Sequence, residues 1–263
     1  MKDWTQILER AAAIIAGYDT GVTLRQLFYR LVAAGILQNR LMDYKTLSAR
    51  TAAARRAGAF PSLIDQTREI IRYQTWTSPE SARAWLARRY RRDRTEGQEA
   101  AVYIGAEKAT LLALLDAWFA DYGVPLLLLR GYGSQTYLDD IAADVEAQGR
   151  PAVLLYAGDF DPSGEDIQRD LIERTGGAFA EIRRVAVLPE QIDALGLVPM
   201  PGKASDSRAA GFVARHGELV QVEVEAIEPN TLQSMMMAAF RELWDFETYD
   251  SVLEQETAER ANL

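Results

Sequence analysis

The stretch AVLLYAGDFDPSGEDIQRD, residues 152–170, decides the fold of this chain. Residues 152–157 are nearly all apolar, which is typical of a strand buried on both faces of a sheet. Asp159 and Asp161 follow, in the place where open α/β sheets bind their ligands. Two carboxylates this close together repel each other unless a cation lies between them. The pair therefore predicts a hard, oxygen-binding cation such as Mg²⁺.

A turn of Pro162, Ser163 and Gly164 comes next, and Ser163 is the expected N-cap of a helix that begins near Glu165. The Asp pair has two other interpretations. In one, an Asp caps this helix while the other is solvated. In the other, the pair resembles that of the haloacid-dehalogenase-type phosphatases, whose nucleophilic Asp also opens an Asp-x-Asp motif after a strand. A further acid at the same edge of the sheet would favour a metal site instead.

An acid of this kind lies upstream of the pair. Residues 101–106 predict a second apolar strand, followed directly by Glu107 and a helical run. Residues 124–129 predict a third strand, which ends in a glycine turn before another helix. Three such strand–helix units in series imply a parallel sheet, whose strands all end at the same edge. Glu107, Asp159 and Asp161 should therefore converge on one small volume.

This ordered set of acids resembles the Toprim domain of topoisomerases, primases and some nucleases, over about residues 102–187. In that family a Glu after the first strand and an Asp-x-Asp pair after a later one hold Mg²⁺ for phosphoryl transfer on nucleic acid. The resemblance implies Glu107, Asp159 and Asp161 as metal ligands, with Mn²⁺ as an alternative metal. A haloacid dehalogenase would carry its Asp-x-Asp on the first strand and further acids downstream, which is the opposite order.

Composition narrows the chemistry and the location. The 263 residues suffice for one large core or two small ones, and we expect two domains. The absence of Cys excludes disulfides and thiolate metal sites, and the single histidine, His216, argues against His-ligated zinc and histidine-based triads. No apolar run approaches the roughly 20 residues that span a bilayer, and the first residues lack the apolar core of a signal peptide. We therefore expect a cytoplasmic protein with no membrane partner.

Charge is distributed very unevenly along the chain, although the net charge is only −9. Of the 29 Lys and Arg residues, 17 lie in residues 1–95, together with 8 of the 38 Asp and Glu residues. The first part therefore has a net charge of +9 and the remainder −18. Such an asymmetry indicates a basic portion that faces nucleic acid, attached to an acidic one.

The basic portion has the spacing of a helix-turn-helix unit. Residues 4–16 are amphipathic, Thr23 caps a run to about residue 34, and Asp43 is the expected N-cap of a third helix that ends near Gly58. Residues 59–62 could lead into the hairpin of a winged helix. The alternative is a small helical bundle with a solvated basic face. The third helix is the candidate DNA contact and carries Lys45, Arg50, Arg55 and Arg56.

Within the second helix, Arg25 and Tyr29 stand four residues apart and should lie side by side. A guanidinium beside a phenol suggests phosphate binding and a lowered phenol pKa. The alternative is a half-buried tyrosine with a solvated hydroxyl.

Together the two motifs resemble the A subunit of topoisomerase VI and the meiotic double-strand-break transesterase related to it. In that family a winged-helix segment with the pattern Arg-x-hydrophobic-aromatic-Tyr precedes Toprim, and the last Tyr is the nucleophile. The resemblance implies that Tyr29 attacks duplex DNA with Arg25 nearby, and that Glu107 takes part in catalysis as well as in metal binding. A stretch with Lys203, Ser205, Asp206 and Arg208, and the later residues 222–227, resemble a segment that follows Toprim in the family.

The same resemblance bears on partners. The chain begins almost directly with its first helix, without the segment that contacts the ATPase subunit in the family. It thus looks like the stand-alone, reduced A-subunit homologues, and an ATPase-type B subunit is not an expected partner. We expect a homodimer with composite sites, in which the tyrosine of one subunit faces the metal site of the other.

The expected architecture is mixed α/β: a winged-helix-like domain over residues 1–80, a basic linker helix over 81–98, and a Toprim-like parallel-sheet domain with a C-terminal extension over 99–263. The expected function is Mg²⁺-dependent, DNA-associated cleavage through a phosphotyrosyl link. The alternatives are a Toprim-type nuclease that uses water and a non-catalytic DNA-binding module. Besides the third helix, the residues expected to contact nucleic acid are Arg88 and Arg89 in the linker, and Lys203.

Overall fold

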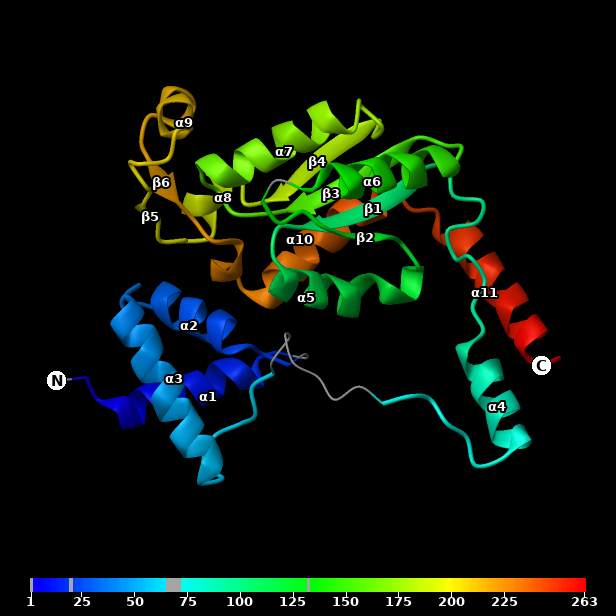
Figure 1. Cartoon of the computed structure of the whole chain (residues 1–263), viewed down its shortest axis with the longest axis horizontal. Coiled ribbons are helices and arrows are strands. Elements are labelled where there is room, and N and C mark those ends of the chain that lie inside the picture. Colours follow the sequence, from blue (N-terminus) through cyan, green and yellow to red (C-terminus); the bar gives the residue numbers. More distant parts are fainter. Residues whose placement is uncertain (1, 19–20, 65–71, 132) are drawn as a thin grey trace.

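Four parallel strands form the centre of the molecule. A computed structural model describes residues 2–18, 21–64, 72–131 and 133–263. Its main sheet has the order β2-β1-β3-β4 (Figure 1), with every neighbouring pair parallel. The strands are β1 (Ala101–Ala106), β2 (Leu126–Leu128), β3 (Ala152–Ala157) and β4 (Glu181–Ala186). The expected parallel sheet is confirmed, although β2 is shorter than residues 124–129.

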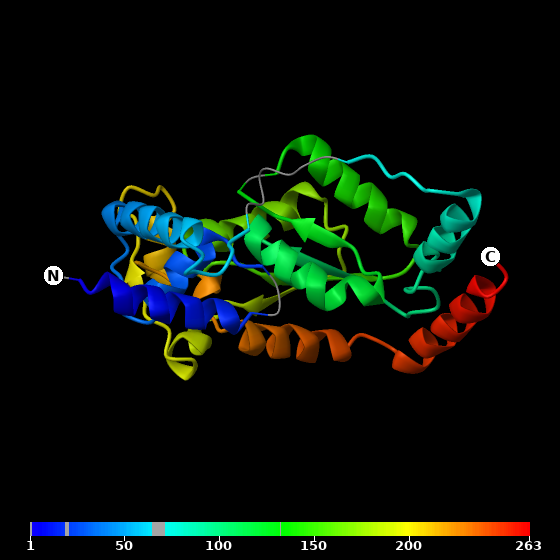
Figure 2. The ribbon, with the colours of Figure 1, turned by 90° about the horizontal axis from the view of Figure 1, so that it is seen from below.

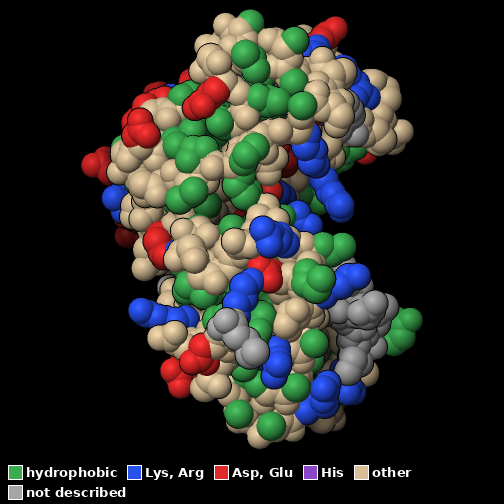
Figure 3. Space-filling model, turned by 90° about the vertical axis from the view of Figure 1, so that its left-hand side faces the viewer, with side chains coloured by type: hydrophobic (Ala, Val, Ile, Leu, Met, Phe, Trp, Pro, Cys, Tyr) green, Lys and Arg blue, Asp and Glu red, His purple; other side chains and the backbone are tan. Residues whose placement is uncertain are grey.

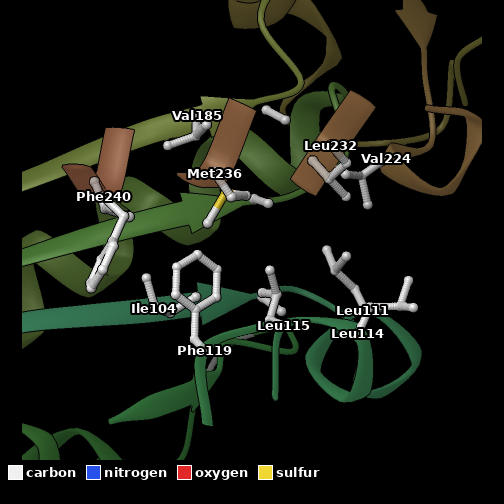
Figure 4. Close-up of a cluster of buried hydrophobic side chains, with 14 of the residues drawn as sticks. Ile104, Leu111, Leu114, Leu115, Phe119, Val185, Val224, Leu232, Met236 and Phe240 are labelled. Atoms are coloured by element: carbon white, nitrogen blue, oxygen red, sulfur yellow. The ribbon is translucent and has the colours of Figure 1, made fainter. Parts of the chain in front are cut away.

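Helices cover both faces of this sheet, which explains why β1 and β3 are apolar at every position. On one face lie α5 (Ala109–Phe119) and α10 (Pro229–Arg241), and on the other α6 (Gln135–Ala147) and α7 (Pro162–Arg174). Successive residues of β1 point to opposite faces, so that Ile104 packs with α5 and α10 while Tyr103 packs with α6. Figure 4 shows the first core, in which the rings of Phe119 and Phe240 meet edge to face at 5.2 Å.

Three N-terminal helices form a separate small core beside the sheet: α1 (Trp4–Ala16), α2 (Leu24–Ala33) and α3 (Leu41–Arg56). Thr23 caps α2 as expected, in a reciprocal capping box with Gln26. The expectation for Asp43 is wrong, because α3 begins two residues earlier. Asp43 lies inside its first turn, accepts a hydrogen bond from the Gln38 backbone at 3.2 Å and pairs with Lys2.

The described part of the segment after α3 contains no winged-helix hairpin. It carries one isolated bridge, between Thr23 and Ile64, while residues 65–71 lie outside the described residues. The remaining elements are α4 (Pro79–Arg89), η1 (Ala120–Tyr122), α8 (Pro189–Ala194), β5 (Met200–Pro201), α9 (Ala209–His216), β6 (Val220–Gln221), η2 (Val224–Ala226) and α11 (Phe246–Arg260).

The basic linker is fastened to the C-terminal helix by ion pairs. Figures 1 and 2 both show α4 beside α11, at the end of the molecule away from α3. Arg94 binds the carboxylate of Glu256 through two nitrogens, at 2.8 and 3.1 Å, and only 2% of the Glu256 side chain is exposed. Arg92 pairs with Glu259 at 2.6 Å. These arginines therefore neutralise acids of α11, whereas Arg88 and Arg89 remain exposed.

We expect Glu256→Gln to destabilise the fold by about 3 kcal/mol at pH 7, because it leaves the buried Arg94 with only a longer pair, at 3.7 Å, to the exposed Asp121. The hydrogen bonds from Arg94 hold the pKa of Glu256 below its usual range. A carboxylate of this kind contributes its full stability above the usual carboxyl pKa and loses it as the pH falls through the lower folded value. The difference between wild type and variant in urea unfolding should therefore shrink below about pH 4. Glu254→Gln, at an exposed position of the same helix, is the control. An unchanged difference at low pH would contradict this account.

Candidate active site at the carboxyl edge of the sheet

Glu107 and Asp159 lie side by side because β1 and β3 are neighbours in register, with Ala106 opposite Ala157. The backbone N–H of Asp159 donates to Oε2 of Glu107 at 2.9 Å. Burial raises the pKa of Glu107 to about 7, and the charge of Asp159 adds to the effect. The expectation that these two acids share one edge of the sheet is confirmed.

Asp161 also lies at this edge, where it caps a helix. It is the N-cap of α7, and its Oδ1 accepts a hydrogen bond from the Gly164 N–H at 2.7 Å. The expectation that Ser163 caps this helix is therefore wrong. Pro162 opens the helix, where its fixed φ and missing N–H cost nothing. Gly164 must stay small, because a Cβ there would lie 2.2 Å from the Asp159 carbonyl oxygen. The tight turn keeps both aspartates at the strand end.

The ammonium of Lys108 lies among the carboxylates of Asp159, Glu223 and Glu225. We call these four residues the acid–lysine cluster. Nζ is 2.7 Å from Oδ2 of Asp159 and 3.6 Å from Oε2 of Glu225, and it also pairs with Glu223. Burial disfavours the charged ammonium, but Asp159 and the two glutamates outweigh it and raise the pKa of Lys108. Burial likewise raises the pKa of Asp159, against the opposing effect of Lys108.

Glu223 and Glu225 were not among the expected site residues. Residues 222–225 alternate Val and Glu, as in a strand. In the sequence this segment indicates only a resemblance to one that follows Toprim. In the structure an antiparallel bridge joins Val222 to Phe160, and the Val224 N–H donates to Oδ1 of Asp159 at 2.9 Å. Thr110 further fixes Glu225, donating to it at 2.6 Å. Long-range pairing brings these acids to the site, so no local signal in the sequence could have placed them.

Tyr29 reaches the same region from the N-terminal helices. Its ring centroid is 5.8 Å from Nζ of Lys108, and Arg25 donates to its hydroxyl at 3.3 Å. Helix α2 is held there by Arg30, which donates to the Ala226 carbonyl at 2.7 Å. The chain therefore brings its own Tyr29 and its own acid–lysine cluster together.

The Arg25–Tyr29 pair is confirmed as a contact, and Arg25 acts to lower the phenol pKa as expected, but the net shift of that pKa is upward. Burial raises the pKa of Tyr29 and the negative charge of Glu223 adds to this, which together outweigh the lowering effects of Arg25 and Lys108. The phenol is thus protonated at neutral pH. A pocket of about 350 Å³ opens beside it, lined by Arg25, Phe28, Tyr29, Asn39, Arg40, Leu41 and Tyr44.

The expected nucleic-acid contacts are exposed but lie in different places. Figure 3 shows basic side chains over the N-terminal helices, in the lower half of that view, and where these helices meet the upper part of the molecule. Helix α3 carries Lys45, Arg50, Arg55 and Arg56, all exposed. Arg88 and Arg89 lie on α4 at the opposite end, and Lys203 follows β5. Of these groups, only the α3 group lies on the same helical unit as Tyr29.

The acids at the edge suit Mg²⁺ by chemistry, since every ligand would be an oxygen. Within the described ranges, however, no three acids surround one position that could hold a metal ion. The contacts give the reason, because Asp161 faces the start of α7 and Lys108 takes up Asp159. Glu107, Asp159 and Asp161 therefore fit the ion in the chemistry of their oxygen atoms, whereas in this structure Asp159 is paired with Lys108 and the three acids do not surround one position.

No protein-family model and no curated protein matches the sequence. Among the described residues, no helix combines the length and the apolar character needed to cross a membrane. The chain is a mixed α/β protein built on a four-stranded parallel sheet.

Proposed function

We propose that this chain is a Mg²⁺-dependent, DNA-cleaving transesterase, with a winged-helix-like N-terminal part and a Toprim-like sheet similar to those of the topoisomerase VI A subunit. One observation carries the proposal: Tyr29, which accepts a hydrogen bond from Arg25, lies next to the acid–lysine cluster at the carboxyl edge of a parallel sheet. A phenol, a guanidinium and carboxylates are the groups that phosphoryl transfer to tyrosine requires.

In the proposed reaction, Oη of Tyr29 attacks a backbone phosphorus of duplex DNA. A bond forms between Oη and phosphorus, and the bond from phosphorus to one deoxyribose oxygen breaks. The phenol loses its proton to solvent, and the leaving oxygen takes one up, so no water is consumed. Arg25 binds the phosphate beside Tyr29 and favours the phenolate. Glu107, Asp159 and Asp161 would hold Mg²⁺, which when bound neutralises charge on the phosphoryl group and the leaving oxygen.

The substrate class follows from charge. The exposed basic side chains of α3 and the pocket arginines, Arg25 and Arg40, lie on the same N-terminal unit as Tyr29. Clustered cations of this kind bind the phosphate backbone of DNA with strong salt dependence. The basic N-terminal part, with a net charge of +9, would supply the contacts to the backbone, which reconciles a net charge of −9 with a polyanionic substrate.

Trapping a covalent complex tests the proposal. Labelled duplex DNA is incubated with the protein and Mg²⁺ or Mn²⁺, denatured in detergent and resolved by electrophoresis. A label that migrates with the protein, and is released by protease, supports a phosphotyrosyl link. Cleavage of the DNA with no attached label would instead support the water-using nuclease. The raised pKa of Tyr29 favours this second candidate, because a protonated phenol is a poor nucleophile until substrate binds.

We propose further that the protein acts as a two-fold homodimer, which suits the two-fold symmetry of a duplex. Within one chain, Nζ of Lys108 contacts both the Tyr29 ring and the Asp159 carboxylate, and the Tyr29 hydroxyl accepts a hydrogen bond from Arg25. A composite site would free each tyrosine from this arrangement. Mixing Tyr29→Phe with Asp159→Ala subunits, each inactive alone, should then restore single-strand cleavage. No recovery, in mixtures that light scattering shows to be heterodimers, would mean that each chain builds its own site.

A further inference from the structure

Lys108 provides a mostly buried positive charge within the acid–lysine cluster. Only 17% of its side chain is exposed, and the three carboxylates around it are exposed by 8% (Asp159), 14% (Glu223) and 4% (Glu225). Buried carboxylates need a counter-charge, and an ammonium within ion-pair distance supplies it. In this arrangement Lys108 supplies one positive charge to three carboxylates.

The oxygen of Asp159 that pairs with Lys108 cannot bind Mg²⁺ at the same time. A Mg²⁺ ion binds carboxylate oxygens at about 2.0–2.1 Å. The Asp159 oxygen is already 2.7 Å from Nζ. An ion on that oxygen would therefore lie within about 5 Å of the ammonium, where two positive charges in a mostly buried site repel strongly. Binding of the metal at Asp159 requires Lys108 to leave.

The structure also offers Lys108 a place to go. Its four-carbon side chain is flexible, and the Tyr29 ring already lies 5.8 Å from Nζ, on the side of the Arg25 pocket. An ammonium displaced from the acids would arrive where the proposed reaction needs a positive charge, beside the phenol and the DNA phosphate.

We propose that Lys108 is the resident counter-ion of the acid–lysine cluster, that a divalent cation displaces it from Asp159, and that it then turns toward Tyr29. The first two steps concern metal binding alone. The last step rests on the proposed DNA cleavage and on a site built within one chain, so that a failure of cleavage or a composite dimer site would leave the ion exchange standing.

Metal binding without DNA tests the exchange. Calorimetric titration with Mg²⁺, and with Mn²⁺, is carried out on wild type, Lys108→Met and the exposed control Arg241→Met. Because Lys108→Met removes the competing charge, we expect it to bind either ion at least about tenfold more tightly than wild type. The control should bind like wild type. Equal affinities in all three proteins, or no metal binding in any of them, would overturn the proposal.

A second measurement uses the unaltered protein, in case Lys108→Met does not fold. The chain has four lysines, and Lys45 and Lys203 are exposed internal standards. Acetylation by succinimidyl acetate, followed by mass spectrometry, reports each lysine separately. Lys108 should react slowly in chelator and several-fold faster in saturating Mg²⁺, while the two standards keep their rates. A Lys108 rate that does not respond to Mg²⁺ contradicts the displacement.

Discussion

Replacing Tyr29 with phenylalanine should abolish the detergent-resistant DNA adduct and lower strand cleavage by at least about 1,000-fold, as expected when a nucleophile is removed. The change deletes one oxygen, which accepts a hydrogen bond from the exposed Arg25 at 3.3 Å. The fold should therefore lose about 1 kcal/mol or less. Cleavage and adduct are measured on the same labelled duplex, and thermal unfolding shows that the variant is folded.

The matched control is Tyr73→Phe, at a tyrosine that is 90% exposed. It should keep both cleavage and adduct. Three outcomes are informative. Loss of both in Tyr29→Phe alone supports the transesterase. Cleavage that persists without an adduct identifies the nuclease and leaves Tyr29 a structural role. An adduct that persists means that another residue is the nucleophile.

Asp159→Asn is the second large prediction, with metal-dependent cleavage reduced by at least about 100-fold. The amide can still accept the Val224 N–H through its oxygen, so the local backbone should hold. What disappears is one negative charge, on which both Lys108 and the proposed Mg²⁺ depend. A metal that stabilises the transition state by several kcal/mol accounts for a loss of this size.

The control for Asp159→Asn is Asp170→Asn, on α7, which breaks only a local pair with Arg174 at 3.1 Å. This variant should cleave like wild type. Calorimetry should show weaker Mg²⁺ binding in Asp159→Asn than in the control. Full cleavage in Asp159→Asn, together with unchanged Mg²⁺ binding, would remove this acid from both the mechanism and the metal site.

The two variants test different parts of the proposed mechanism. Tyr29→Phe tests the nucleophile and leaves metal binding intact. Asp159→Asn tests the acids and leaves the nucleophile in place. If Tyr29→Phe alone keeps cleavage, the site is hydrolytic, and if both keep it, the carboxyl edge is not the active site.

Local sequence patterns determined the elements of this chain. The apolar runs at residues 101–106 and 152–157 became strands because a stretch buried on both faces cannot carry polar side chains. Their series with helices determined the parallel sheet, and that sheet determined the meeting of Glu107 with Asp159. The neighbourhood of Arg25 and Tyr29 likewise follows from helical spacing alone.

Tertiary structure decided what surrounds those groups. Glu223 and Glu225 join Asp159 through a bridge between segments about sixty residues apart, which no local pattern encodes. Lys108 became a counter-ion, and the pKa of Tyr29 rose instead of falling, because burial and charge depend on what packs nearby in space. Secondary structure arises from neighbours along the chain. Electrostatics at a site arises from every charge within several ångströms, whatever its position in the sequence.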